Sequence, residues 1–245
     1  MKVLLVTIAI GYKYLEEYEK LFKESQRIYA EKHGYDFRVI TDYLDPIRQS
    51  RDTISFNKIL VCCQEWSANY DFIIFVDADI LINRNAPAIH TSLDFGDCIG
   101  IVDEYSQPSK EKRLEIQKQM GWELNATAYY KLSEFDLETD KMLNSGVLVC
   151  QPKIHGEFLR IVYEQFLNIC AVHPRGFHYE QSCIGYILQK TNCYKVLDNK
   201  FNALWGIQKI TNDMDLETFF QRNYFIHFAG RTDFDRVEGL HKFLS

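Results

Sequence analysis

The chain has 245 residues, of which 47% are hydrophobic and 25% are charged, with a formal net charge of −6 and a pI near 5.7. This length and apolar content suit one large α/β domain or two small ones, with a substantial buried core. The acidic balance argues against a general attraction to nucleic acid or anionic lipid, and it favours a small molecule or a neutral carbohydrate as partner.

The first 102 residues follow the strand, helix, strand order of a parallel sheet. Apolar runs predict strands over Val3–Ile10, Phe37–Ile40 and Phe72–Val76, and apolar residues at helical spacing predict helices over Tyr14–His33 and Phe56–Ala68. We therefore expect a doubly wound α/β sheet in which Phe72–Val76 is buried on both faces.

The second half is expected to continue the same unit, so that residues 1–245 form a single domain. Its predicted strands are Cys98–Val102, Gly146–Cys150, Tyr194–Leu197 and Tyr224–Phe228, and its predicted helices are Phe158–Cys170 and Gln181–Gln189. The polar segment 103–142 contains a candidate solvated helix, Lys110–Met120, and a polar tail is expected after Phe228.

No feature of the sequence indicates secretion or a membrane anchor, so the expected location is the cytoplasm. The run Val3–Ile10 is too short to span a bilayer, and no small-residue cleavage site follows it. The seven cysteines are odd in number, contain no C-x-x-C pair and lie mostly in apolar runs. This pattern predicts reduced, buried thiols rather than disulfides or a zinc site.

Two carboxylates, Asp77 and Asp79, directly follow the buried strand Phe72–Val76. If the strand conformation persists through Ala78, both side chains point to the same side. Like charges held together are costly unless they are neutralised, and a hard divalent cation with oxygen ligands neutralises them best. Because ligands of open α/β sheets bind beyond the carboxyl ends of strands, we predict a divalent cation here, beside a diphosphate.

The same spacing recurs at Asp213 and Asp215, and again at Asp233 and Asp235. Neither of these pairs follows a buried strand, and the first lies where a helix N-terminus attracts acids. We interpret both pairs as structural. Phosphatases of the haloacid dehalogenase type also place Asp-x-Asp after an apolar strand, with the first aspartate as nucleophile, and they remain an alternative.

Four segments, in the same order along the chain, resemble the retaining glycosyltransferases of family eight, the glycogenin group. They are SFNKILVCCQEW around Lys58, FIIFVDADILINR around Asp77, LNSGVLVCQP at 143–152 and IHFAGR at 226–231. The resemblance implies a GT-A fold, which is a Rossmann-like domain with a mixed sheet. It also implies a nucleotide-binding half over residues 1–102 and a donor-sugar and acceptor half over residues 103–245. Separately, the polar character of segment 103–142 suggests an insertion near the acceptor site.

The resemblance further implies the roles of individual residues. His227 would complete a metal site with Asp77 and Asp79, and an imidazole beside carboxylates suits Mn²⁺ better than Mg²⁺. Lys58 and Arg231 would balance phosphate charge, and Tyr12 would stack on the base. The full set implied for donor binding is Thr7, Ala9, Tyr12, Lys58, Asp77, Ala78, Asn144, Ser145, Gly146, Gly230 and Arg231.

Two positions depart from the family pattern. Asp233 stands where the group usually has a lysine, and we expect Arg231 to substitute for that cation. Glu180 replaces the aspartate of an Asp-Gln pair, and we expect Glu180 and Gln181 at the reacting centre. The Asp-x-Asp and His-Phe-Ala-Gly features also resemble the retaining xylosyl- and galactosyltransferases of family thirty-four.

The expected function is metal-dependent transfer of a hexose or pentose from a nucleotide-diphosphate sugar, with uridine favoured as the base. The expected acceptor is a hydroxyl group of a carbohydrate or glycoprotein, and retention of configuration is implied by the resemblance alone. No nucleic-acid partner and no transmembrane segment are expected. A catalytically silent nucleotide-sugar-binding or scaffold protein is the second alternative, because the departures at Glu180 and Asp233 would allow it.

Overall fold

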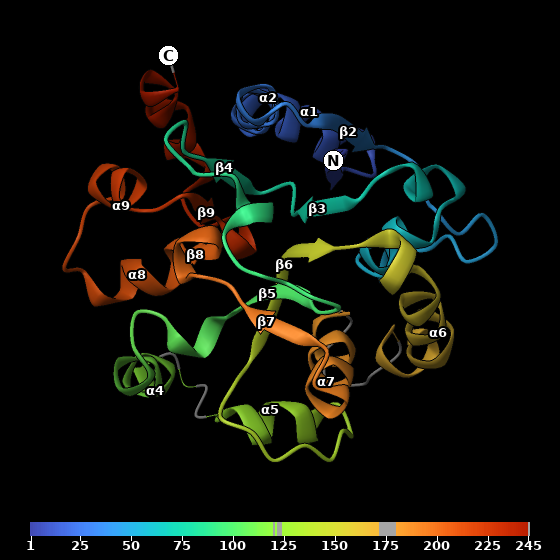
Figure 1. The fold of residues 1–245 in the computed structure, drawn as a ribbon. Helices are drawn as coiled ribbons and strands as arrows, with labels where there is room; N and C mark the ends of the chain where they lie inside the picture. The colour runs from blue at the N-terminus through green and yellow to red at the C-terminus, as the bar shows by residue number, and fades with distance from the viewer. Residues whose placement is uncertain (120, 122–123, 172–179, 245) are drawn as a thin grey trace.

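The computed structural model describes residues 1–119, 121, 124–171 and 180–244, which form a six-stranded sheet with a three-stranded sheet beside it (Figure 1). In spatial order the large sheet contains β2 (Asp36–Ile40), β1 (Val3–Ile8), β3 (Phe72–Val76), β6 (Leu143–Cys150), β5 (Ile99–Asp103) and β7 (Tyr194–Val196). The small sheet contains β4 (Ile80–Ile82), β9 (Phe225–His227) and β8 (Ala203–Leu204).

The large sheet is mixed. Strand β1 is parallel to both β2 and β3, as the strand, helix, strand order predicts. Strand β6 runs antiparallel to β3 and β5, so its first residues lie at the same edge as the carboxyl end of β3. There, the backbone N–H of Asp77 donates to the carbonyl of Gly146 at 2.8 Å. The predicted α/β class is confirmed, and two of the resembling segments meet at this edge.

Helices cover both faces of the large sheet (Figure 1). The helices of the described residues are α1 (Tyr12–Leu21), α2 (Lys23–His33), α3 (Asn57–Leu60), α4 (Lys110–Gln119), α5 (Ala126–Leu132), α6 (Pro152–Ala171), α7 (Gln181–Thr191), α8 (Trp205–Thr211) and α9 (Leu216–Arg222). Alternation along β1 places Leu4 and Val6 in the core shared with α3, α6 and α7, and Leu5 in the core shared with α2. Among the described residues, no helix is long and apolar enough to cross a membrane.

Two predicted helices are interrupted in the structure. The helix predicted over Tyr14–His33 divides into α1 and α2 at Phe22, whose backbone leaves the helical region (φ −121°, ψ −34°) and whose ring packs on Phe228 and Phe234. The helix predicted over Phe56–Ala68 is only one turn, followed by 3₁₀ turns, because Gln64 is extended (φ −77°, ψ 145°). At Phe22, tertiary packing thus overrides the helical spacing.

The remaining differences concern boundaries and short elements. Strands β4 and β8 were not predicted, since two or three residues carry no periodicity of their own. Segment 103–142 contains α4 and α5, and β6 begins at Leu143, earlier than predicted. Met120, at the end of one predicted helix, lies outside the described residues, as do His178 and Tyr179 before Glu180.

The expected polar tail is instead a packed segment. Residues Phe234–Phe243 form 3₁₀ turns that bury Val237 and Leu240 against Tyr18 and Leu21 of α1. In Figure 1 this red C-terminal segment accordingly lies near the blue helices α1 and α2. Apolar burial, rather than surface charge, therefore holds the C-terminus in place.

Replacement of Leu240 by alanine should lower the free energy of unfolding by about 2–5 kcal/mol, because it leaves a cavity in this cluster. Glu238→Ala on the same segment is the matched control. It removes only the exposed pair between Lys20 and Glu238, and such a pair contributes at most about 1 kcal/mol. Chemical denaturation measures both, and equal effects would contradict the packing account.

Candidate functional site

The carboxylates of Asp77 and Asp79 converge through a turn. Strand β3 ends at Val76, and the N–H of Ile80 donates to the carbonyl of Asp77 at 3.2 Å. Gln26 of α2 supports the turn, since its Nε2 donates to the carbonyls of Ile80 at 3.0 Å and Asp77 at 3.4 Å. The strand does not run on through Asp79 because the chain leaves the large sheet here to join the small one.

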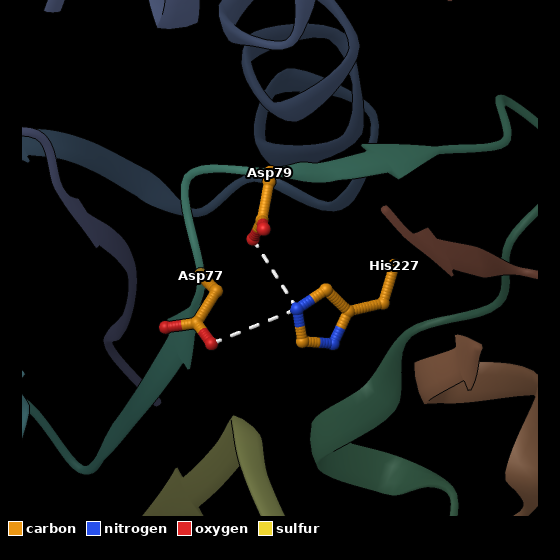
Figure 2. Close-up of side chains that lie close together, drawn as sticks. All are labelled: Asp77, Asp79 and His227. Carbon is orange, nitrogen blue, oxygen red and sulfur yellow. Dashed lines mark ion pairs between the residues drawn. The ribbon is translucent and has the colours of Figure 1, made fainter. Parts of the chain in front are cut away.

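His227 lies opposite the two carboxylates, on the neighbouring strand β9 (Figure 2). Its Nε2 is 3.2 Å from Asp79 Oδ1 and 3.8 Å from Asp77 Oδ2. With metal–ligand distances of about 2.1 Å, neighbouring ligand atoms lie about 3 Å apart, so the three atoms can share one ion. Two carboxylates and one imidazole form a donor set that fits a divalent cation.

Burial and mutual attraction shift the pKa values of these three groups in different directions. Burial raises the pKa of Asp77 above its usual value, despite the nearby Lys58 and His227. Burial also opposes ionisation of Asp79, but attraction to His227 outweighs it and lowers the pKa of Asp79. Burial would lower the pKa of His227, yet Asp79 raises it above 6.5. His227 therefore keeps its second proton to a higher pH than an ordinary histidine.

Lys58 is a buried cation between Asp77 and Glu180. Its ammonium nitrogen is 2.8 Å from Asp77 Oδ1, 2.7 Å from Glu180 Oε1 and 3.5 Å from the carbonyl of Ser145. Ser145 Oγ donates to the same Glu180 oxygen at 2.5 Å. Burial would lower the pKa of Lys58, but its attraction to Asp77 and Glu180 raises it. The three N–H donors of Lys58 thus face three protein acceptors, and Glu180 is held by two partners.

The space beside His227 leaves room only for a glycine at position 146. A Cβ atom at this position would lie 2.7 Å from His227 Cε1, 2.8 Å from His227 Nδ1 and 2.9 Å from Asn144 Oδ1. All three distances are shorter than van der Waals contact, so any side chain here displaces the imidazole or the amide. The glycine of the Asn-Ser-Gly segment is therefore a condition for seating His227.

Two further side chains at the site escaped the sequence analysis. Asn202 Oδ1 lies 2.9 Å from His227 Nδ1, and Asn202 Nδ2 donates to Asn144 Oδ1 at 2.6 Å. Glu104 Oε2 accepts from Asn144 Nδ2 at 2.6 Å and from Gln181 Nε2 at 3.4 Å. Asn202 lies in a single 3₁₀ turn and Glu104 directly follows β5, so a polar residue after a strand was the only available signal.

The residues expected to hold the nucleotide base lie at the end of β1 and the start of α1. Thr7 and Ala9 are fully buried, and the Thr7 hydroxyl has no hydrogen-bond partner in the described part of the chain. Tyr12 is 81% exposed. Of these three side chains, only the ring of Tyr12 is open to a ligand.

Gly230 and Arg231 follow β9 in the left-handed region, with φ of 69° and 64°. The guanidinium of Arg231 forms an ion pair with Glu17 of α1 and lies 5.0 Å from the centre of the Phe234 ring. Since both partners of this ion pair are partly exposed, the pair contributes little to stability. The guanidinium can therefore change partner at small cost.

The two other Asp-x-Asp pairs have structural partners. Asp215 caps α9, where its Oδ1 accepts the N–H of Thr218 at 2.9 Å. Asp233 Oδ1 pairs with the ammonium group of Lys209 on α8 at 2.6 Å, and Asp233 Oδ2 accepts from Trp205 Nε1 at 2.8 Å. Within the described ranges, one cluster of acidic and histidine side chains has the spacing for a metal ion, and it is the one drawn in Figure 2.

Comparisons with known proteins agree with this geometry. Residues 5–233 match Glycosyl transferase family 8, whereas no curated protein matches the chain in sequence. The fold is similar to that of a glycosyltransferase involved in the glycosylation of the major capsid of PBCV-1, with 18% identity, a TM-score of 0.63 and coverage of 99% of this chain and 100% of that one.

Two other solved structures are similar in fold. One is the bifunctional glycosyltransferase WbbM, with 13% identity, a TM-score of 0.62 and coverage of 100% of this chain and 49% of that chain. The other is the galactosyltransferase LgtC in complex with donor and acceptor sugar analogs, with 11% identity, a TM-score of 0.58 and coverage of 100% and 95%. At these identities the likeness concerns the fold, and it confirms the predicted GT-A architecture.

Gly146→Ala should weaken binding of a divalent cation about tenfold or more, because the added Cβ displaces His227 from the carboxylates. Gly239→Ala is the control, since a Cβ at that position meets nothing within 4 Å. Calorimetric titration with Mn²⁺ measures both variants. Unchanged affinity in Gly146→Ala would contradict the placement of the imidazole.

Binding of the cation should weaken as the pH falls, because the proton and the cation compete for His227 Nε2. The pKa of His227 is raised, so this loss begins above pH 6.5, whereas the lowered pKa of Asp79 keeps that carboxylate ionised to below pH 3.8. Mn²⁺ titrations at a series of pH values measure the effect. Its absence in the wild type, or its persistence in His227→Gln, would contradict this assignment.

Proposed function

The chain belongs to glycosyl transferase family 8 and is a glycosyltransferase, and from this premise we propose that it transfers a sugar from a nucleotide-diphosphate sugar to a hydroxyl group. The proposed donor carries uridine, and the proposed acceptor is a carbohydrate or glycoprotein. Transfer depends on a divalent cation and retains the anomeric configuration. The observation that carries the proposal is the convergence of Asp77, Asp79 and His227 beyond the carboxyl end of β3.

Charge at the site supports the metal requirement. Of the three carboxyl groups at the site, Asp77 and Glu180 pair with the ammonium group of Lys58, whereas Asp79 lies beside His227. A divalent cation beside a neutral His227 balances their formal charge. The nitrogen ligand favours Mn²⁺ over Mg²⁺, which prefers an all-oxygen environment. When bound, the cation supplies electrophilic stabilisation of the diphosphate leaving group.

Arg231 is the proposed second contact of the diphosphate. Its exposed ion pair with Glu17 is weak, and a guanidinium binds phosphate oxygens in a bidentate manner. Lys58 contributes indirectly, because its ammonium group is enclosed by Asp77 and Glu180 rather than open to a ligand.

Glu180 and Gln181 are the proposed residues of the reacting centre. Glu180 is 2% exposed and bound by Lys58 and Ser145, so its role is to hold negative charge at a defined place. The Gln181 amide donates to Glu104 at 3.4 Å, and its proposed role is to offer its carbonyl oxygen to the sugar. The side chains of Asn144 and Ser145 and the backbone at Gly146 would orient the same sugar.

The two halves of the chain would divide the substrates between them. Residues 1–102 would hold the nucleotide, with Tyr12 on the base, Thr7 and Ala9 beneath it, and the backbone of Ala78 near the ribose. Residues 103–245 would hold the donor sugar and the acceptor, with Gly230 beside the diphosphate. The metal site draws ligands from both halves, so donor binding would tie them together.

Membership of glycosyl transferase family 8 argues against the alternative of a haloacid dehalogenase-type phosphatase. The catalytically silent alternative differs in one measurable respect. An active enzyme slowly hydrolyses its donor when no acceptor is present, whereas a silent binding protein leaves the donor intact. NMR of the released sugar would at the same time report whether configuration is retained.

The direct test is calorimetric binding of UDP-glucose, UDP-galactose, UDP-xylose and GDP-mannose with and without Mn²⁺. We expect one UDP-sugar to bind in a metal-dependent manner, and Asp79→Asn to abolish that binding because it removes a charged ligand. Asp215→Asn is the matched control, since asparagine caps α9 as well as aspartate does. Binding of no donor, or equal loss in both variants, would overturn the proposal.

A further inference from the structure

We propose that Asn202 is a positioning residue of the metal site, which keeps a proton on His227 Nδ1 and so leaves Nε2 for the cation. The inference rests on the metal-dependent function proposed above. It is carried by the direction of a buried hydrogen-bond chain that runs from His227 through Asn202 and Asn144 to Glu104.

The direction of this chain is imposed at Asn144. A backbone N–H can only donate, and the N–H of Gly146 lies 2.9 Å from Asn144 Oδ1. On the other side, the Glu104 carboxylate accepts from Asn144 Nδ2 at 2.6 Å. Glu104 also accepts from the buried Arg113, whose Nη2 donates to Glu104 Oε1 at 2.7 Å. The amide of Asn144 therefore has one possible orientation, with its oxygen toward Asn202.

The orientation of Asn202 follows from that of Asn144. Because Asn144 Oδ1 is an acceptor, the atom of Asn202 that lies 2.6 Å from it must be the donor Nδ2. Asn202 Oδ1 then faces His227 Nδ1 at 2.9 Å and can only accept. Nδ1 is therefore the nitrogen that carries a proton, and Nε2 is directed at Asp79 and Asp77.

The side-chain amide of Asn202 cannot flip, because its surroundings fix its position. Asn202 is 0% exposed, and its backbone carbonyl accepts from Gln107 Nε2 at 2.9 Å. Gln107 Oε1 in turn accepts the backbone N–H of Leu204 at 3.0 Å. A flipped amide would set two oxygens or two N–H groups against each other in a buried place, which is costly. The bonds of Gln107 to the backbone and the side-chain bond between Asn144 and Asn202 together fix which imidazole nitrogen faces the cation.

Asn202→Ala and Asn202→Asp distinguish positioning from general stability. Alanine removes the acceptor, and we expect it to weaken Mn²⁺ binding about 10- to 100-fold, as is usual for partners of a ligating histidine. Aspartate keeps an acceptor toward His227 Nδ1 but sets its second oxygen against Asn144 Oδ1, so we expect it to recover only part of the affinity. Asn83→Ala is the control, because Asn83 is a buried asparagine that bonds the carbonyl of Phe220 away from the site.

Calorimetric Mn²⁺ titration and unfolding are measured on all three variants. The inference requires that Asn83→Ala and Asn202→Ala both lower stability, that Asn83→Ala leaves the Mn²⁺ affinity unchanged, and that Asn202→Asp binds Mn²⁺ more tightly than Asn202→Ala. Equal affinity in wild type and Asn202→Ala, or equal loss in Asn83→Ala, would overturn it.

A second measurement needs neither donor nor activity. With ¹⁵N-labelled histidine, the resonances of His227 are assigned by comparison with His227→Gln, and the diamagnetic ion Mg²⁺ is added. We expect the Nδ1 proton to persist and to exchange slowly in the wild type, and to exchange fast in Asn202→Ala. Loss of the proton from Nδ1, rather than from Nε2, would sink the inference.

The two proposals fail in different ways. If no metal binds, the proposed function is wrong, but the Nδ1–H resonance of the metal-free protein still reports whether Asn202 holds it. If metal and donor bind while that resonance is the same in wild type and Asn202→Ala, the function stands and the role of Asn202 is wrong.

Discussion

Two sheets meet at the turn from Asp77 to Ile80, where the chain leaves β3 and pairs with β9 as β4. This backbone pairing sets Ile80 opposite His227, and it brings an imidazole near the C-terminus to two carboxylates in the first third of the chain. The glycosyltransferase site depends on it, since neither sheet alone contains all three groups. Gln26 adds a contact from α2, so the turn is supported from outside both sheets.

Burial then decides how the charges at the site behave. At one edge of the sheet, Asp77 and Glu180 lie within hydrogen-bond reach of Lys58, and Asp79 lies within hydrogen-bond reach of His227. Burial of a charge is costly unless a partner compensates it. Burial prevails at Asp77 and raises its pKa, whereas attraction to His227 prevails at Asp79 and lowers its pKa. Lys58 serves two carboxylates at once, and the excess of negative charge that remains beside a neutral His227 is what a divalent cation would balance.

Directional bonds convert this charged cluster into a defined geometry. The N–H of Gly146 and the carboxylate of Glu104 orient Asn144, which in turn orients Asn202 and His227. Because a side chain at 146 would overlap the imidazole, the glycine provides both the space and the donor that start the chain. Packing and hydrogen bonding therefore reinforce the same arrangement, as expected for a polar network in a low-dielectric interior.

The sequence by itself determined the α/β class, the buried strand before Asp77, and the family, because apolar periodicity and short motifs are local properties of the chain. It also indicated Asp77, Asp79 and His227, although for His227 only through the order of motifs. The tertiary structure alone decided how these groups meet, the partners of Lys58, the division of α1 from α2 at Phe22, and the places of Asn202 and Glu104. The physical reason is that strand pairing, burial and side-chain hydrogen bonds join residues far apart in the chain, and no local pattern records such contacts.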